Sequence, residues 1–277
     1  MKLSIAIAAE RAEPSAFVVW RGFEQAFAKA AAYGYHGVEL ALRSADEFRQ
    51  ENIRELLRRN QLTVSCISTG QVFAAEGLSF SNPSPDIRKR TVSVFRDLMH
   101  IASDWGGMVN IGRARGSVLQ SQRRGDVENL FLEGLYELIP DAESLGVRLV
   151  IEPINRYESN FLNTVDEAAA CAAKAGSGFI GVMPDVFHMN IEDDDICRSL
   201  TRNSRYIGYI HLADSNRQYP GRGHLDFTAI LRTLQEAHYD GWCSVEILPK
   251  PDPDTAALEA AKALLSIRET DLGKVWN

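Results

Sequence analysis

The feature that most constrains the fold is an alternation of short apolar runs with helical patterns, repeated eight times along the 277 residues. Strands that alternate with helices imply parallel strands joined by crossover helices. Eight such units within roughly 250 residues match the count of a (β/α)8 barrel. The predicted strands are 3–8, 37–40, 63–68, 108–112, 148–152, 180–185, 206–212 and 241–246. The predicted helices are 23–32, 46–60, 86–105, 127–145, 165–175, 193–203, 227–238 and 254–272.

An open, doubly wound sheet is the main alternative for such a pattern. That fold usually has a Gly-rich phosphate-binding turn after its first strand. Here the first predicted strand continues into AAER, residues 8–11, and the motif is absent. No linker, low-complexity segment or change of composition divides the chain. We therefore predict an α/β protein in which residues 1–277 form a single (β/α)8 TIM barrel.

Charge and cysteine usage narrow the class of protein. The net charge of −7 and the pI of 5.5 argue against a broad nucleic-acid-binding surface, which needs clustered Lys and Arg. The four cysteines are widely spaced, with no C-x-x-C pair, as is typical of reduced thiols in the cytoplasm. No apolar run of roughly 18 residues occurs, and the N-terminal run is too short for a signal peptide. We expect a cytoplasmic protein with neither a nucleic-acid nor a membrane partner.

Polar side chains stand at the ends of the last four predicted strands: Glu152, Asp185, His211 and Glu246, which are 26 to 35 residues apart. The carboxyl ends of barrel strands converge on one pocket. Taken singly, each acid could be a helix cap or a surface charge, and His211 could be a core histidine. Together, three carboxylates and one imidazole suit a divalent ion such as Mn²⁺, Co²⁺ or Mg²⁺ better than a thiol-rich zinc site does. The spacing thus predicts a metal site.

Further polar residues follow the same strands and are candidates for binding a polyol, although each could equally be an ordinary loop residue. They are Glu158, His188 and Arg217, with Gln71 and Arg115 after earlier strands. The segment PGRG, residues 220–223, has some likeness to a phosphate loop, but a turn before the helix at Phe227 is the better interpretation.

Long motifs in the second half of the chain resemble those of the ketose 3-epimerases, the tagatose/psicose 3-epimerase group of the xylose-isomerase-like TIM barrels. These motifs are EPINRYE, DVFHMNIE, HLADSNRQYPGRGHLDF and VEILP. The segments ISTGQVF, GLSFSNP and HLADSNR are most similar to the 5-keto-gluconate epimerase branch. The resemblance implies one divalent metal, often Mn²⁺, bound by Glu152, Asp185, His211 and Glu246, and a homodimer or homotetramer. It also implies that Glu152 and Glu246 are the acid/base pair.

The resemblance further implies that Glu158, His188 and Arg217 contact the substrate, a ketose or keto-sugar acid. Inverting its C3 requires removing a proton on one face and returning one on the other, through an enediolate. Two carboxylates and a metal fit this isomerase reaction. The alternatives are an aldose–ketose or inosose isomerase or dehydratase, an abasic-site endonuclease, and a non-catalytic sugar-binding barrel.

Two positions depart from the family pattern. Pro184 precedes Asp185, and a proline within a central strand removes a ladder hydrogen bond, so the strand could end early and displace Asp185. Arg113 stands where an apolar residue is usual and could add positive charge to the pocket. With Arg43, Arg115 and Arg217 it could bind a carboxylated or a phosphorylated substrate, although each arginine could equally be a solvated or helix-pairing charge. Since no Gly-rich phosphate-binding loop is evident after the last two strands, a carboxylated substrate or a neutral ketose is favoured over a phosphorylated one.

Overall fold

The computed structural model describes residues 1–13, 17–270 and 276. In this part of the chain eight parallel strands lie in the order β7-β6-β5-β4-β3-β1-β9-β8. Parallel bridges from Val182 to Ile207 and from Asp185 to His211 join β7 to β8 and complete the ring. The strands are β1 (Lys2–Ala8), β3 (Gly37–Ala41), β4 (Thr63–Ser68), β5 (Met108–Ile111), β6 (Arg148–Ile151), β7 (Ile180–Val182), β8 (Tyr209–Leu212) and β9 (Trp242–Val245). The predicted barrel is confirmed.

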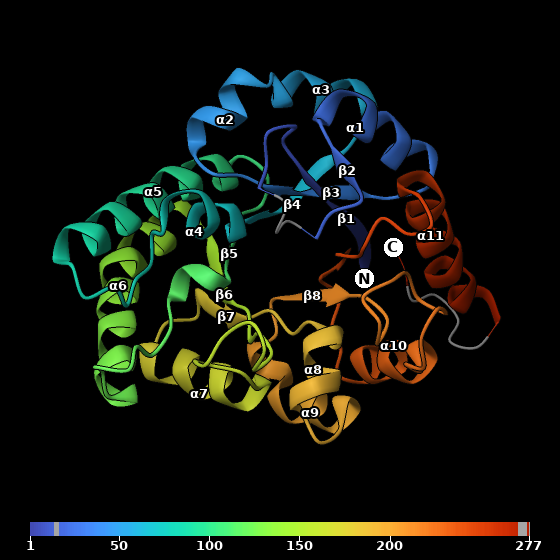
Figure 1. Cartoon of the computed structure of the whole chain (residues 1–277). Helices are drawn as coiled ribbons and strands as arrows, with labels where there is room; N and C mark the ends of the chain where they lie inside the picture. Colours follow the sequence, from blue (N-terminus) through green and yellow to red (C-terminus); the bar gives the residue numbers. More distant parts are fainter. Residues whose placement is uncertain (14–16, 271–275, 277) are drawn as a thin grey trace.

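Helices surround the strands on the outside of the barrel (Figure 1). Those that follow strands as crossovers are α1 (Phe23–Ala32), α3 (Ile53–Asn60), α5 (Pro85–Ser103), α6 (Arg124–Leu145), α7 (Val165–Ala175), α9 (Ile196–Asn203), α10 (Phe227–Glu236) and α11 (Pro253–Thr270). Short elements add to them: β2 (Trp20–Arg21), α2 (Ala45–Gln50), α4 (Gly70–Glu76), α8 (Val186–Glu192), and the 3₁₀ turns η1 (Arg113–Arg115) and η2 (Ser204–Tyr206). The predicted end of the last helix, at 272, lies outside the described residues. No helix among those described is long and apolar enough to cross a membrane.

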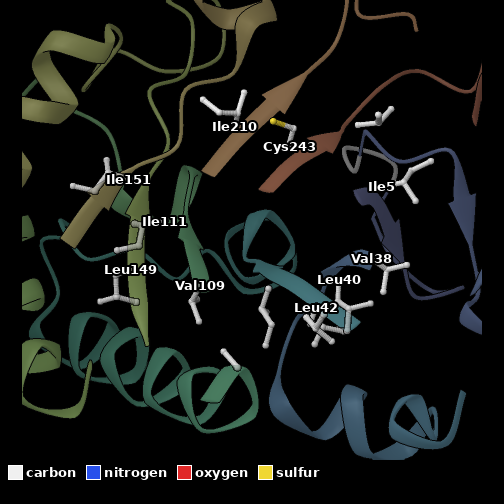
Figure 2. Close-up of a cluster of buried hydrophobic side chains, with 14 of the residues drawn as sticks. Ile5, Val38, Leu40, Leu42, Val109, Ile111, Leu149, Ile151, Ile210 and Cys243 are labelled. Atoms are coloured by element: carbon white, nitrogen blue, oxygen red, sulfur yellow. The ribbon is translucent and has the colours of Figure 1, made fainter. Parts of the chain in front are cut away.

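The alternation of side chains along each strand directs the polar groups into the barrel. Leu149 and Ile151 of β6 belong to the large core between strands and helices, whereas Val150 belongs to a cluster inside the barrel. Figure 2 shows members of the outer core, including Leu149 and Ile151, beside β6 and the neighbouring strand β5. Since successive side chains point to opposite faces, the next residue, Glu152, points inward.

Several predicted elements differ from the observed ones. The predicted strand 206–212 begins only at Tyr209, because Ser204–Tyr206 form the 3₁₀ turn η2. The predicted helix 46–60 is divided into α2 and α3, because Asn52 adopts a left-handed conformation (φ 50°) that interrupts the helical backbone. The predicted strand 180–185 ends at Val182, as expected from Pro184. Asp185 is nevertheless not displaced, because the Pro184 carbonyl accepts a hydrogen bond from the His211 amide (2.9 Å) and keeps the segment alongside β8.

Candidate active site

The four predicted metal ligands converge at the carboxyl ends of β6 to β9. One ligand atom from each of Glu152, Asp185, His211 and Glu246 lies within 4.8 Å of the others. Nδ1 of His211 is 3.2 Å from Glu152, 3.9 Å from Glu246 and 4.0 Å from Asp185. Glu152 and Glu246 directly follow β6 and β9, which are separated in the ring by β7 and β8. The two carboxylates therefore approach the centre from different sides.

Asp185 tests whether these residues fit a cation. Its side chain is fully buried. Oδ1 caps α8 by accepting from the Phe187 amide (2.8 Å), but Oδ2 has no hydrogen-bond partner among the described residues. A buried carboxylate oxygen without a partner is costly. Burial raises the pKa of Asp185 to about 6. A divalent ion beside Oδ2 would give this oxygen a partner and would balance the buried negative charge. The residues of the site therefore fit a metal.

The pKa values of the other two acids, Glu152 and Glu246, are shifted in opposite directions. Burial opposes ionisation of Glu152, but the hydrogen bond and positive charge of His211 outweigh it and lower the pKa of Glu152 to about 2. Glu152 also accepts a hydrogen bond from the Asn110 amide (2.9 Å). For Glu246, burial is the dominant effect and raises the pKa to about 7.

Glu39 of β3 is a buried member of the site that the sequence analysis missed. Its two carboxylate oxygens lie 2.9 and 3.1 Å from Nε2 of His211, the ring nitrogen opposite the ligand cluster. The signal in the sequence is a charged residue inside the apolar run GVELA, where the alternation that points Val38 and Leu40 outward points Glu39 inward.

Arg217 joins the predicted substrate contacts to the metal ligands. Its guanidinium donates to Glu158 (2.9 Å) and to Glu246 (3.0 Å). It is packed between two aromatic rings, 3.5 Å from the centroid of Phe17 and 4.7 Å from that of Phe187. These contacts fix a fully charged group beside one half of the predicted acid/base pair.

His188 is held by Asn155 of the EPINRYE motif. The Asn155 side-chain amide lies 2.7 Å from Nδ1 of His188 and donates to Glu158 (3.1 Å). Burial lowers the pKa of His188 to about 3, so the ring is neutral. Nδ1 is then the acceptor and Nε2 carries the proton, 3.7 Å from Asp185. Asn155, in the loop after β6, therefore orients two of the predicted contacts.

A cavity of about 570 Å³, counted out to its open mouth, contains most of these groups. Its lining includes Glu152, Glu158, His188, Arg217 and Glu246. Gln71 and Arg113 line the same cavity from the far side, beyond β4 and β5. Oε1 of Gln71 accepts from the Glu13 amide (2.7 Å), which leaves its amide nitrogen as a donor. Arg113 has no ion-pair partner among the described residues.

The structure places Arg115 elsewhere than predicted. It is fully buried and does not line the cavity. Its guanidinium donates to the carbonyl groups of Gly112 (2.9 Å), Phe161 (2.7 Å) and Leu162 (3.2 Å). The bonds to Phe161 and Leu162 tie the loop after β6 to the turn after β5, and the bond to Gly112 lies within that turn. Arg115 thus holds the segment that carries Glu158, and its donors are directed to backbone carbonyl groups.

The segment 220–223 also has a structural explanation. The carboxylate of Asp214, fully buried, accepts from the backbone amides of Ser215 (2.7 Å), Gly221 (2.8 Å) and Leu225 (3.2 Å). These donors outweigh burial and lower the pKa of Asp214. The loop is therefore an anion-binding turn that an internal carboxylate already fills, in agreement with the interpretation as a turn.

The ring of parallel strands, with three acids and a histidine gathered at its carboxyl end, defines a TIM barrel with a candidate metal site. Residues 27–267 match the family model described as xylose isomerase-like TIM barrel, and the chain belongs to that family.

Among proteins of known name, this chain is similar to several sugar epimerases. The D-psicose 3-epimerase of Ruminiclostridium cellulolyticum is 28% identical over 221 residues, covering 77% of this chain and 74% of that protein. The 3-dehydro-D-guloside 4-epimerase of Escherichia coli is 33% identical over 105 residues, which cover 38% of this chain and 40% of that protein. The predicted likeness to ketose 3-epimerases is confirmed by such relatives.

A solved structure of D-psicose 3-epimerase with D-tagatose, from Clostridium cellulolyticum, superimposes with a TM-score of 0.79 and 22% identity. The superposition covers 97% of this chain and 98% of the chain in that structure. At this level of identity the structural likeness is evidence for the fold.

Proposed function

We propose that the protein is a divalent-metal-dependent epimerase that inverts C3 of a ketose, or the equivalent carbon of a keto-sugar acid. The observation that carries the proposal is the meeting of Glu152 and Glu246 in one ligand cluster, with ligand atoms within 4.8 Å, at a cavity lined by hydrogen-bonding side chains. The names of the relatives, which are epimerases acting on ketoses and a dehydro-guloside, support the same reaction class.

Glu152 and Glu246 are the proposed acid/base pair. Epimerisation needs a group on one face of C3 to remove a proton and a group on the other face to return one. The two carboxylates come from strands on either side of β7 and β8, so they can reach opposite faces of a substrate lying between them. No electrons are gained or lost overall. A bound divalent ion, held by Glu152, Asp185, His211 and Glu246, would stabilise the negative charge that develops on the substrate oxygens.

Glu158, His188 and Arg217 are the proposed substrate contacts near the reacting carbon. His188 offers an Nε2–H donor, and Glu158 offers a carboxylate acceptor whose Oε1 is fixed by Asn155 and Arg217. Gln71 and Arg113 would contact the far end of the substrate. Both present donors there, and an all-donor end suits the carboxylate of a keto-sugar acid as well as the hydroxyl groups of a ketose.

Proton exchange in D₂O tests the reaction. The metal-free protein is loaded with Mn²⁺ and incubated with a panel of ketoses and keto-sugar acids, and products are analysed by NMR. Deuterium at C3 with inverted configuration is expected. Deuterium only at C1 or C2 would indicate aldose–ketose isomerisation instead. Sugar binding without exchange would indicate a non-catalytic barrel, and cleavage of abasic DNA would indicate an endonuclease.

The Arg113→Ala variant tests the far end of the pocket. If the substrate is carboxylated, KM for the keto-sugar acid rises and KM for a neutral ketose stays the same. Equal effects on both substrates would show that Arg113 does not select a carboxylate.

We also propose that Mn²⁺ is the native metal and that the protein is a cytoplasmic homo-oligomer. Oxygen-rich ligands with one imidazole support Mn²⁺. All four cysteines are free, which supports a reducing compartment. Tyr157, 82% exposed at the rim of the site, is a large aromatic side chain that an interface between copies would cover. Metal analysis of the purified protein and light scattering after gel filtration test the metal and the oligomeric state.

A further inference from the structure

We infer that Glu39 is a positioning residue that sets the tautomer and orientation of His211 for metal binding. The inference rests on the proposed metal site but not on the proposed reaction. It starts from the two ring nitrogens of His211, which face opposite surroundings. Nδ1 faces the three other ligands, between 3.2 and 4.0 Å away, and Nε2 faces the carboxylate of Glu39.

Glu39 can accept only if Nε2 carries a hydrogen. Its carboxylate is fully buried, and the two oxygens lie 2.9 and 3.1 Å from Nε2. Among the described residues it has no ion pair with Lys or Arg, so the histidine is its charge partner. When a metal takes the place of the hydrogen on Nδ1, the hydrogen on Nε2 stays with Glu39, and the ring is then neutral with its Nδ1 lone pair toward the ligand cluster. This is the state that a metal requires, since imidazole binds through an unprotonated nitrogen.

Small side chains inside the barrel allow Glu39 and His211 to meet, although their strands are not neighbours. Glu39 on β3 and His211 on β8 are separated in the ring by β1 and β9. The residues in register with them on those strands are Ala6, paired with Glu39, and Ser244, paired with His211. Both are small, which leaves the centre of the barrel free for the two longer side chains to meet. Large residues at either position would fill that space.

The same arrangement makes His211 a better ligand. A carboxylate that accepts from the outer nitrogen of a ligating histidine fixes the ring and increases the basicity of the inner nitrogen, and its loss typically weakens metal affinity about 10- to 100-fold. Glu39 does not touch the cavity, so it contributes through His211 alone.

Titration of the metal-free protein with Mn²⁺ tests the inference, with no sugar present. Glu39→Gln keeps the size and one acceptor but removes the charge, and should bind Mn²⁺ about tenfold more weakly. Glu39→Leu removes the acceptor and should bind about a hundredfold more weakly. Glu47→Gln is the matched control, because Glu47 is a buried carboxylate that pairs with Arg43 (2.8 Å) outside the ligand set. Its affinity should equal that of the wild type.

A second measurement needs no substitution. Nitrogen-15 NMR of the Mg²⁺-loaded wild type should show His211 with a proton on Nε2 and none on Nδ1. Wild-type Mn²⁺ affinity in both Glu39 variants, or a proton on Nδ1 in the loaded protein, would overturn the inference. Absence of Mn²⁺ binding by the wild type would overturn it together with the metal site. If Mn²⁺ binding depends on Glu39 but the protein exchanges no sugar proton, the inference stands and the proposed reaction is refuted.

Discussion

Replacing Asp185 by asparagine should stabilise the metal-free protein, although it removes a proposed metal ligand. In that state the carboxylate is fully buried and Oδ2 lacks a partner. Asparagine has nearly the same shape and no charge. Its Oδ1 can still accept from the Phe187 amide, so the cap of α8 is retained.

The size of the effect follows from the pKa. Burial raises the pKa of Asp185 from 3.8 to about 6 in the folded protein. Each unit corresponds to about 1.4 kcal/mol, so the ionised side chain lowers the free energy of unfolding by about 3 kcal/mol at pH 8. Because the folded pKa is the higher one, the penalty begins as pH rises above the unfolded value and is complete above the folded value. At pH 5 roughly half of it applies.

Urea denaturation after EDTA treatment measures this prediction. The free energy of unfolding of Asp185→Asn should exceed that of the wild type by about 3 kcal/mol at pH 8 and by about half as much at pH 5. Adding Mn²⁺ should reverse the order, because ligand binding stabilises only the wild type appreciably. A variant less stable than the wild type at pH 8, or a gain that does not shrink at pH 5, would refute the reasoning.

Asp214→Asn is the matched control, and its free energy of unfolding should change in the opposite direction. Asp214 is also fully buried, but backbone amides surround its carboxylate and lower its pKa. The amide group of asparagine would face those donors, so this variant should be less stable than the wild type at pH 8.

Three further predictions concern affinity, turnover and stability. Mn²⁺ affinity should fall by at least about tenfold between pH 8 and pH 6, because protons on Glu246 (pKa about 7), Asp185 (pKa about 6) and His211 must leave before the metal binds; burial lowers the pKa of His211, but the carboxylates of Glu39 and Glu246 outweigh it and raise that pKa well above its usual value. Calorimetry at both pH values measures this. Asn155→Asp should lower kcat/KM at least tenfold and leave Mn²⁺ affinity unchanged, because a carboxylate cannot donate to Nδ1 of His188; equal losses in both quantities would contradict this. Arg115→Ala should lower the free energy of unfolding by about 3 kcal/mol, since three carbonyl groups lose a buried partner, and thermal denaturation checks it.

The sequence was sufficient to predict the barrel and the meeting of the four candidate ligands, because both depend on periodicity. Eight strand–helix units predict the ring, and the last residues of parallel strands must meet at one end of it. Asp185 shows the limit of this argument. Pro184 correctly predicted an early end to β7, but the position of Asp185 depends on a hydrogen bond from β8 to the Pro184 carbonyl. That contact joins two different strands, and no local pattern encodes it.

Arg115 and Asn155 show why the substrate contacts were harder to predict. Both lie in loops that follow strands, where a polar side chain can face either the cavity or the backbone of a neighbouring loop. Arg115 turns inward and binds carbonyl groups of the loop after β6, whereas Asn155 binds two residues that line the cavity. The choice is set by which loop packs against which. Distance along the chain carries little information about it.

For Glu39, the direction of the side chain could be predicted from the sequence, but its partner, His211, could not. Alternation along β3 points it into the barrel, and a buried carboxylate must find a charge partner. That partner is 172 residues away, on a strand two positions beyond its neighbour in the ring. Only small residues at the intervening positions allow the contact. The proposed metal site therefore depends on small side chains such as Ala6 and Ser244 as well as on its ligands. Enlarging Ser244, which does not line the substrate cavity, should disturb His211 and leave that cavity unchanged.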